Sequence, residues 1–455
     1  MINMRQEAAL ALEEILCRGG YSSLTVNEFL KRMDEKIKEQ DRRFFTSLVY
    51  TTLQHLPTID AVIAAHSKTP LTKVKPYLLV CLRMGICQLK YMEGVPDRAA
   101  IHETVEVVKQ SRYRGLAGFV NGVLRAAQRS GLAYPMPILT QEPVKALGLQ
   151  YDMPDWIVER WLESYGREQT EKLLQKMQMP GCVCLRANTL RAPVEEIGRQ
   201  IQLKTPVRQS EAVKEAFYAE HVGDISQWSL YQQGMIAVQD ESSMLAALAT
   251  GVKPGDTVLD LCAAPGGKST FMAQMMQNQG RIVSRDLHAH RVKLIQENAE
   301  RLGASILQAE VSDATCARQE DAEHYDVVLL DAPCSGLGIL RSKPDIKLHH
   351  SLEDEKQLTE LQRQMLIVAA AAVKPGGTLV YSTCTLNHRE NEDQIQWFLK
   401  NEPNFLLTDL ENRLPTLPEC DRLWNKYLTL WPQVNGHDGF FVACMKKRTD
   451  RVTEN

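Results

Sequence analysis

The sequence has few cysteines and no long apolar run. Its 11 cysteines among 455 residues are an odd number and form no Cys-x-x-Cys pair, which argues against a disulfide scaffold and a zinc knuckle. The longest apolar run, Met365 to Val373, has nine residues, well short of the ~20 that cross a bilayer. We therefore expect reduced thiols in a cytosol, where a cysteine with a special role is more often a nucleophile than half of a bridge.

Signals for export and for disorder are also missing. Glu7 follows the first basic residue closely, which argues against a signal peptide. Hydrophobic residues make up 44% of the chain and charged residues 24%, as in soluble globular proteins. The length allows two to four domains, each large enough to bury its own core.

The net charge of −3 hides an asymmetry along the chain. Residues 1–140 hold 19 Lys and Arg against 13 Asp and Glu, which gives +6, and the remainder therefore carries −9. A basic end on an acidic body favours a polyanion as the partner of the first part, although ordinary surface scatter would give the same sum.

Hydrophobic periodicity divides the chain into three predicted domains. Residues 1–140 show helical spacing, broken by glycine and proline into roughly six or seven helices. Residues 141–235, which follow a proline-rich linker, mix helices with short strands such as Val183 to Arg186. Residues 236–448 alternate strands with helices, which predicts a parallel sheet covered on both faces. The strands expected there are Thr257 to Cys262, Arg281 to Arg285, Ser305 to Gln308, Asp326 to Asp331 and Thr378 to Ser382.

Doubly wound sheets bind ligands at the carboxyl ends of their strands. The first strand runs into the small, glycine-rich segment Cys262 to Thr270, where a ligand can approach the backbone closely. The next strand ends at Asp286, nineteen residues after Gly267, the spacing at which an acid holds ribose hydroxyls. Asp313 lies beyond the following strand, where a carboxylate could reach an adenine amino group. Together these features predict a nucleoside-cofactor site.

Two cysteines follow the ends of two further strands. Cys334 lies just past the strand that ends at Asp331, and Cys384 lies just past the next. A thiolate that adds to carbon 6 of a cytosine makes carbon 5 electron-rich, and a second group must then assist proton removal and release. A thiol pair beside a nucleoside cofactor therefore suits methylation of carbon 5, with Asp331 at the polar edge of the ring.

These segments resemble the signature set of the Sun-type family of RNA cytosine-5 methyltransferases, which use S-adenosyl-L-methionine. The resemblance rests on segments that occur in family order, namely Leu259 to Lys268, Leu330 to Gly338, Arg341-x-x-Pro-Asp345, Tyr381 to Thr385 and Gly439 to Ala443. It implies a doubly wound, Rossmann-like α/β methyltransferase domain.

The resemblance also implies roles for residues of this chain. The implied catalytic residues are Cys384 as the nucleophile, Cys334 as the cysteine that assists release, Asp331 and Lys268. The implied cofactor site consists of Cys262, Ala263, Ala264, Pro265, Gly266, Gly267, Lys268, Asp286, Asp313 and Asp331. No metal is expected.

The first two domains carry resemblances of their own. Phe119 to Arg125 is similar to the signature of the NusB family, an all-helical RNA-binding fold. Met153 to Trp161 and Leu185 to Arg191 resemble the α+β module that precedes the catalytic domain in the same methyltransferases. This domain order implies 16S ribosomal RNA as the partner, and we expect a cytoplasmic monomer without membrane contact.

Two other functions stay open at this stage. The glycine-rich segment resembles a Walker A loop, but that loop would need glycine at position 262, where cysteine stands. A non-catalytic RNA-binding factor would need neither the thiol pair nor the glycine-rich loop. Titration with S-adenosylmethionine and with ATP separates the three readings.

Overall fold

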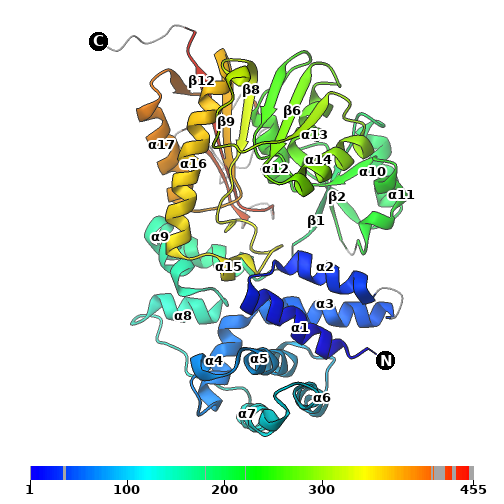
Figure 1. Ribbon diagram of the computed structural model, residues 1–455, viewed down its shortest axis with the longest axis vertical. Coiled ribbons are helices and arrows are strands. Elements are labelled where there is room, and N and C mark those ends of the chain that lie inside the picture. Colours follow the sequence, from blue (N-terminus) through cyan, green and yellow to red (C-terminus); the bar gives the residue numbers. More distant parts are fainter. Residues whose placement is uncertain are drawn as a thin grey trace. The chain divides into compact units, whose positions relative to one another are not determined.

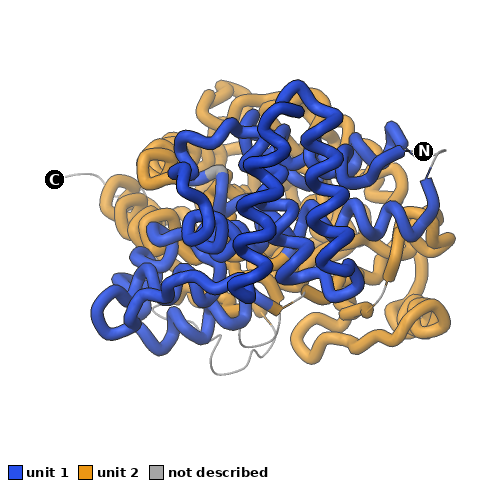
Figure 2. Tube along the Cα trace, turned by 90° about the horizontal axis from the view of Figure 1, so that it is seen from below, with its two compact units in different colours: residues 1–178, 342–350 blue, residues 179–341, 351–455 orange. Residues whose placement is uncertain are grey.

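The structure is a computed structural model, and it describes residues 2–33, 37–179, 181–220, 222–410, 413–414, 426–432 and 437–449. The chain forms two compact units, coloured separately in Figure 2. Unit 1 comprises Met1–Gln178 with Ser342–His350, and unit 2 comprises Met179–Arg341 with Ser351–Asn455. Within the described residues, no helix is long and apolar enough to cross a membrane.

Unit 1 is helical throughout its described part. Its α-helices are α1 (Met4–Arg18), α2 (Ser22–Met33), α3 (Glu39–Gln54), α4 (Leu56–His66), α5 (Pro76–Tyr91), α6 (Asp97–Lys109), α7 (Ala117–Arg129), α8 (Pro143–Gln150), α9 (Asp155–Met177) and α15 (Ile346–His349). Short 3-10 turns lie at η2 (Leu71–Lys73) and η3 (Arg114–Leu116). Local signals set the ends of α1: Asn3 accepts hydrogen bonds from the first turn, and Gly19 closes the helix at a φ of 76°. The expectation of an all-helical first domain is confirmed.

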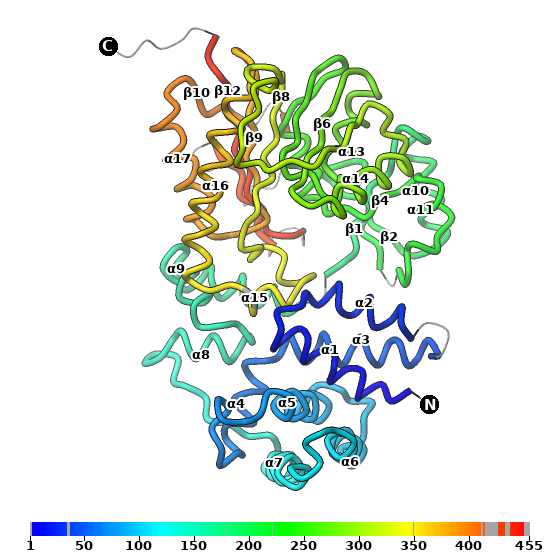
Figure 3. The backbone as a smooth tube through the Cα atoms, viewed as in Figure 1, coloured from blue at the N-terminus to red at the C-terminus, as the bar shows by residue number. Residues whose placement is uncertain are grey.

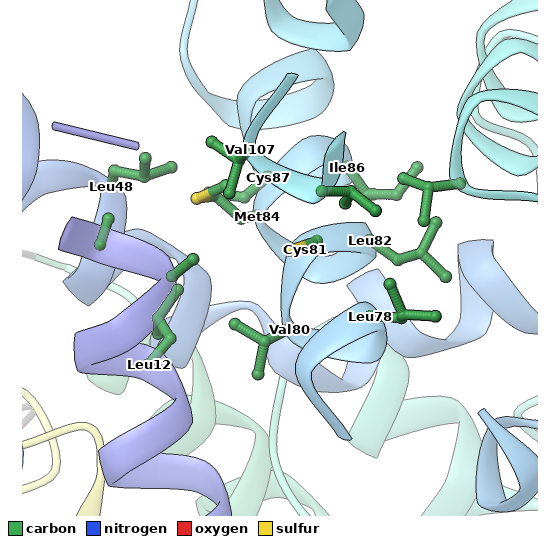
Figure 4. Packing of buried hydrophobic residues seen from close by; sticks show 14 of the residues in the cluster. Leu12, Leu48, Leu78, Val80, Cys81, Leu82, Met84, Ile86, Cys87 and Val107 are labelled. Atoms are coloured by element: carbon green, nitrogen blue, oxygen red, sulfur yellow. The ribbon is translucent and has the colours of Figure 1, made fainter. Parts of the chain in front are cut away.

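The core of unit 1 forms around α5. This helix is buried on more than one face, and Figure 4 shows its side chains between Leu12, Leu48 and Val107 of neighbouring helices. Gly85 lets α7 approach closely, because a Cβ atom at this position would lie 2.7 Å from Leu124 Cδ2. A helix that is apolar on most sides needs such surrounding neighbours to be stable.

One segment of unit 1 comes from far along the chain. Residues 342–350, between Arg341 and Ser351 of unit 2, belong to unit 1. The backbone path from β8 (Tyr325–Asp331) through α15 to α16 (Leu352–Ala372) can be followed in Figure 3. The carboxylate of Asp345 accepts hydrogen bonds from the backbone N–H and the hydroxyl of Ser22, at 2.8 and 2.6 Å. The ammonium of Lys347 donates to the carbonyls of Gln54 and Asp152, both at 2.6 Å.

Unit 2 begins with a small antiparallel sheet. Its strands follow the order β2-β3-β1-β4. The elements are β1 (Val183–Ala187), α10 (Val194–Gln202), β2 (Val207–Gln209), β3 (Ala216–Ala219), η4 (Ile225–Gln227), α11 (Ser229–Gln232) and β4 (Ile236–Val238). Apolar residues of α10, such as Ile197 and Ile201, pack on Leu185 and Phe217 of the sheet. The predicted mixture of helices and short strands is confirmed.

A large sheet follows, with strand order β10-β12-β9-β8-β5-β6-β7 and with β11 paired to β12. Its strands are β5 (Thr257–Asp260), β6 (Arg281–Asp286), β7 (Leu307–Val311), β8 (Tyr325–Asp331), β9 (Val373–Thr383), β10 (Phe405–Leu407), β11 (Leu428–Leu430) and β12 (Phe440–Lys447). The helices around it are α12 (Glu241–Ala249), α13 (Gly267–Met275), α14 (Ala289–Leu302), α16 (Leu352–Ala372) and α17 (Glu392–Asn401), with 3-10 turns η5 (Gln319–Asp321) and η6 (His388–Glu390).

Both faces of this sheet are covered by helices. Along β8, Val327 and Leu329 pack with α12 and α13, whereas Val328 and Leu330 pack with α16 and α17. Figure 1 shows α16 beside β8 and β9, with α13 and α14 across the sheet. Successive residues of a strand point to opposite faces, so a strand with helices on both sides is apolar throughout.

The predicted α/β class is confirmed, with one difference in the sheet. The strands from β9 to β7 are parallel, but β12 pairs antiparallel with β9 from Phe441↔Thr383 to Lys446↔Thr378. The sheet is therefore mixed: the chain continues from β9 through α17, β10 and β11, and β12 then runs opposite to its neighbour β9. The two compact units place α8 and α9 with the N-terminal helices and divide the chain after Gln178. The domain boundaries at 140 and 235 therefore stay predictions.

Candidate active site

The parallel strands bring the predicted site residues to one edge of the sheet. The loop after β5, the acids that end β6 and β8, and the residues after β7 and β9 all lie at carboxyl ends. The backbone N–H of Ser312, just past β7, donates to the carbonyl of Asp286 at 3.1 Å. The strand-end rule therefore correctly predicted which edge carries the polar residues.

The loop from Cys262 to Lys268 is a tight turn that opens α13. The Ala263 N–H donates to the carbonyl of Arg285 at 2.8 Å, and the Gly266 N–H donates to the carbonyl of Ala263 at 2.7 Å. Gly266 has a φ of 98°, a conformation that favours glycine. The peptide between Ala264 and Pro265 is cis. The turn leaves the first N–H groups of α13 at the sheet edge, where they suit a polar ligand.

An ion pair joins this loop to the neighbouring strand. The Lys268 ammonium lies 2.6 Å from Asp331 Oδ2, and the Ser382 hydroxyl donates to Asp331 Oδ1 at 2.8 Å. Burial is the largest single influence on the pKa of Lys268 and lowers it, but the charge and hydrogen bond of Asp331 together with the charge of Asp260 raise the pKa above its usual value. The Lys268 side chain is 12% exposed, and its ammonium lies 5.1 Å from the centre of the Phe440 ring. The Asp331 carboxylate is thus held between the Lys268 ammonium and the Ser382 hydroxyl.

The other two predicted acids differ in their surroundings. Asp286 is buried, and its Oδ1 accepts the His288 N–H at 3.0 Å. Asp313 is exposed, and its Oδ1 accepts the N–H and the hydroxyl of Thr315 at 2.8 and 2.7 Å. These hydrogen bonds lower the pKa of Asp313. The hydrogen bonds described for Asp313 are local, so the structure places it at the predicted edge without joining it to the loop.

The two cysteines are neighbours in space. Cys334 Sγ and Cys384 Sγ lie 3.3 Å apart, although 50 residues separate them in sequence. Both side chains are partly exposed. The hydrogen bond with Cys384, together with burial, raises the pKa of the Cys334 thiol well above its usual value. The geometry therefore offers one thiol hydrogen-bonded to another, at the sheet edge where Asp331 ends β8.

Comparisons with known proteins agree with this arrangement. Residues 247–446 match the family described as 16S rRNA methyltransferase RsmB/F, residues 2–129 match the NusB family, and residues 153–225 match the ferredoxin-like domain of RsmF/B-like methyltransferases. The chain is 40% identical over 445 residues to the probable ribosomal RNA small subunit methyltransferase B of Bacillus subtilis, with 97% of each chain covered. The chain belongs to the ribosomal RNA small subunit methyltransferase B family.

Solved structures place the fold in the same family. The structure titled PH0851 superposes with a TM-score of 0.82 at 28% identity, over 98% of this chain and 99% of that one. A methyltransferase homologue from Pyrococcus horikoshii superposes with a TM-score of 0.58 at 30% identity, over 67% of this chain and 99% of that one. The family methylates ribosomal RNA with S-adenosylmethionine, so a nucleotidase and a non-catalytic RNA-binding factor are both set aside.

The sheet edge has groups suited to this cofactor. The tight turn leaves the start of α13 open, and the acids Asp286 and Asp313 follow consecutive strands. Carboxylates accept hydrogen bonds from hydroxyls and amines, which are the groups on the ribose and adenine of the cofactor. When bound, the cofactor supplies an electrophilic methyl group. The carboxylates and the backbone N–H groups of this edge therefore suit a nucleoside cofactor that carries a cationic centre.

Sequence reasoning missed three features around this site. Asp260 is fully buried at the end of β5, and the Ser269 hydroxyl donates to its Oδ2 at 2.5 Å. Burial raises the pKa of Asp260 to about 7. Arg186 of the small sheet is fully buried and donates to the Gly267 carbonyl at 3.0 Å. The third feature is the pair Glu390 and Asn391, whose side chains form hydrogen bonds with residues adjacent to the two cysteines. An acid inside an otherwise apolar strand was the only sequence signal for Asp260.

Proposed function

We propose that this enzyme methylates carbon 5 of a specific cytosine in 16S ribosomal RNA through a covalent cysteine–cytosine intermediate. The observation that carries the proposal is the 3.3 Å separation of the Cys334 and Cys384 sulfurs, at the sheet edge that also holds the cofactor loop. Carbon 5 of cytosine is a weak nucleophile, so a thiolate that activates the ring from carbon 6 meets the main chemical demand of the reaction.

In the proposed first step, the Cys384 thiolate adds to carbon 6 and forms a carbon–sulfur bond. The electrons of the carbon 5–carbon 6 double bond move to carbon 5, which would take the methyl group of bound S-adenosylmethionine and leave S-adenosylhomocysteine as the second product. Asp331, held between Lys268 and Ser382, accepts a hydrogen bond from the amino edge of the ring. Lys268 adds positive charge close to this group. Cys384 therefore attacks the ring, and Asp331 and Lys268 orient it.

The second step removes the carbon 5 proton and expels the thiolate. Cys334 is suited to this step because the largest cause of its raised pKa is its hydrogen bond with Cys384. That hydrogen bond is lost once Cys384 is bonded to carbon 6, so Cys334 gives up its proton more readily after the attack than before. Removal of the carbon 5 proton then restores the double bond and breaks the bond to Cys384.

The cofactor residues proposed above have separate parts in binding. Cys262 to Lys268 supply backbone groups, Asp286 accepts the ribose hydroxyls, and Asp313 faces the adenine. Unit 1 is proposed to bind the RNA through its basic surface, and the protein is proposed to work as a monomer in the cytoplasm, where ribosomal RNA is made in bacteria.

The product of the reaction tests the proposal directly. Unmodified 16S rRNA is incubated with enzyme and cofactor, digested to nucleosides and analysed by mass spectrometry, while bisulfite sequencing maps the position. We expect 5-methylcytidine at one site, and none with Cys384→Ala. Methylation of a base nitrogen or of a ribose hydroxyl would contradict the proposal.

A further inference from the structure

A buried carboxylate joins the two cysteine-bearing loops from beneath. Glu390, in η6, is fully buried, and its carboxylate accepts four hydrogen bonds from protein donors. Two come from Ser335, whose N–H and hydroxyl lie 2.9 and 2.5 Å away. Gln362 and Asn387 supply the other two, each at 3.0 Å. A carboxylate with every oxygen satisfied in this way is a rigid anchor.

The contacts of Glu390 converge on the residues next to Cys334. Ser335 directly follows Cys334, and Gln362 also donates to the carbonyl of Pro333, which directly precedes it, at 3.0 Å. The loop around Cys334 is therefore held on both sides by Glu390 and by a side chain that Glu390 orients. The Tyr381 hydroxyl, in turn, donates to the carbonyl of Glu390 at 2.7 Å.

The next residue performs the same task for Cys384. Asn391 is buried, and its side chain contacts the residues on both sides of this cysteine. Its amide donates to the carbonyl of Thr385 at 3.0 Å, and its oxygen accepts the hydroxyl of Thr383 at 2.5 Å. Two adjacent side chains thus hold the flanks of the two cysteines separately.

A direct link connects the two halves of this network. The Ser335 and Thr385 hydroxyls lie 2.8 Å apart. Because the Ser335 hydroxyl donates its proton to Glu390, the Thr385 hydroxyl must donate to Ser335. A row of hydrogen bonds therefore leads from the loop of Cys384 through the loop of Cys334 to the Glu390 carboxylate. A shift of either loop would leave buried polar groups without partners, which costs more than a hydrogen bond gains.

We propose that Glu390 and Asn391 are positioning residues that fix the separation of the Cys334 and Cys384 sulfurs and so set the rate of the covalent step. The part of this proposal that concerns the reaction rate rests on the proposed function. Neither residue is placed against the RNA or the cofactor, so both act only through the loops that carry the thiols. Chemistry that depends on two groups within about 3.5 Å is sensitive to a displacement of about 1 Å.

The test compares two buried glutamates of the same cluster in the full-length enzyme. Glu390→Gln replaces one acceptor oxygen by an amino group that faces donors. The matched control is Glu355→Gln; Glu355 is also buried and accepts hydrogen bonds from Asn387 and Arg389, at 2.8 and 3.0 Å. Ser335→Ala is the second test variant, because it removes only the hydroxyl between Thr385 and Glu390.

Two measurements are made on each variant that binds S-adenosylmethionine with the wild-type Kd. The first is kcat and KM for methylation of 16S rRNA. The second is the rate at which diamide closes the Cys334–Cys384 disulfide, a reaction in which the two thiols lose two electrons and two protons to diamide. This second rate depends on thiol geometry and involves no RNA.

We expect Glu390→Gln to lower kcat by about tenfold to a hundredfold at unchanged KM, and to slow disulfide closure by about tenfold. Ser335→Ala should change both in the same direction, and Glu355→Gln should leave both close to the wild-type values. Wild-type rates of disulfide closure in Glu390→Gln and Ser335→Ala would overturn the proposal, as would an equal loss in Glu355→Gln. Absence of 5-methylcytidine with the wild-type enzyme would instead refute the proposed function, and the disulfide rates would still decide the positioning role.

Discussion

The ion pair between Lys268 and Asp331 ties the loop after β5 to β8, and removing one of its two partners has a predictable cost. The two side chains are 12% and 26% exposed, and their charged atoms lie 2.6 Å apart. Removing one partner of a buried pair costs about 3–5 kcal/mol, because the other charge stays buried alone. Asp331 is partly exposed, and an amide at this position still accepts the Ser382 hydroxyl. We therefore expect Asp331→Asn to lower the free energy of unfolding by about 2 kcal/mol.

A double-mutant cycle isolates this cost. Lys268→Met should destabilise less than Asp331→Asn, because Asp331 keeps Ser382 and some water. The double variant should be more stable than the sum of the two losses predicts, by about 1–2 kcal/mol. Urea unfolding followed by tryptophan fluorescence measures the four proteins, and calorimetry measures their Kd for S-adenosylmethionine. The single variants should also bind the cofactor more weakly, since Lys268 lies in the loop that we propose to bind it.

The pH dependence gives the sign of the same effect. The pKa of Lys268 is raised in the folded protein, so the stability that the pair contributes is complete below the unfolded pKa of about 10.4 and is lost only as the pH rises through the higher folded value. The penalty of Asp331→Asn should therefore be constant between about pH 6 and pH 9. Single-variant losses that add within about 0.5 kcal/mol would refute the reasoning.

The acids and the basic surface give three further expectations. Asp286→Ala should weaken S-adenosylmethionine binding by roughly ten- to over a hundredfold by calorimetry, as for a hydrogen bond to a charged acceptor, and an unchanged Kd would reject its ribose role. Burial raises the pKa of Asp260 to about 7, so the folded protein binds more protons than the unfolded chain between about pH 4 and pH 7. As the pH rises through that window, the free energy of unfolding of the wild type should therefore fall relative to that of Asp260→Asn, by up to about 1.4 kcal/mol per pH unit. Urea denaturation should show this, and parallel plots of stability against pH for the two proteins would contradict it. The exposed Lys75 and Arg114 of unit 1 should contact phosphates. Their joint replacement by alanine should weaken RNA binding and reduce its salt slope by about 0.7–0.9 per lost contact in filter binding, whereas a slope no flatter than that of the control Lys145→Ala would show that they make no such contact.

The sequence predicted the parallel half of the large sheet, and the edge at which the polar site residues lie, because both depend on local patterns. Apolar strands between helices identify β5, β6, β8 and β9, and the carboxyl ends of parallel strands must meet at one edge. The loop at Gly266 was predictable for the same reason, since a strand that turns directly into a helix needs glycine there. The neighbouring positions of Cys334 and Cys384 followed from two successive strands.

Other features depend on pairings that no local pattern carries. The antiparallel return of β12 is a matter of chain topology, and its apolar residues look the same in either direction. Asp345 belongs to a signature segment and lies within the residues that match the methyltransferase family, but the structure also places its segment in unit 1, where its carboxylate accepts hydrogen bonds from Ser22, 323 residues away. A partner at that separation leaves no trace in periodicity or composition.

The network beneath the thiols was missed for a related reason. Glu390 and Asn391 follow Cys384 by only six and seven residues, but a polar dipeptide in a loop is usually solvated and gives no signal of burial. Its importance depends on four donors that come from three separate segments. Only the folded chain brings Ser335, Gln362 and Asn387 to the same carboxylate.

The covalent mechanism is tested most directly by the two thiol variants on a denaturing gel. Each is incubated with 16S rRNA and S-adenosylmethionine and then separated under conditions that break all noncovalent contacts. Cys334→Ala keeps the attacking thiol but loses the group that assists release, so enzyme and RNA should accumulate as a covalent complex with a shifted band. Cys384→Ala, and the double variant, should show none. A shifted band with Cys384→Ala, or no shifted band with Cys334→Ala, would contradict the account.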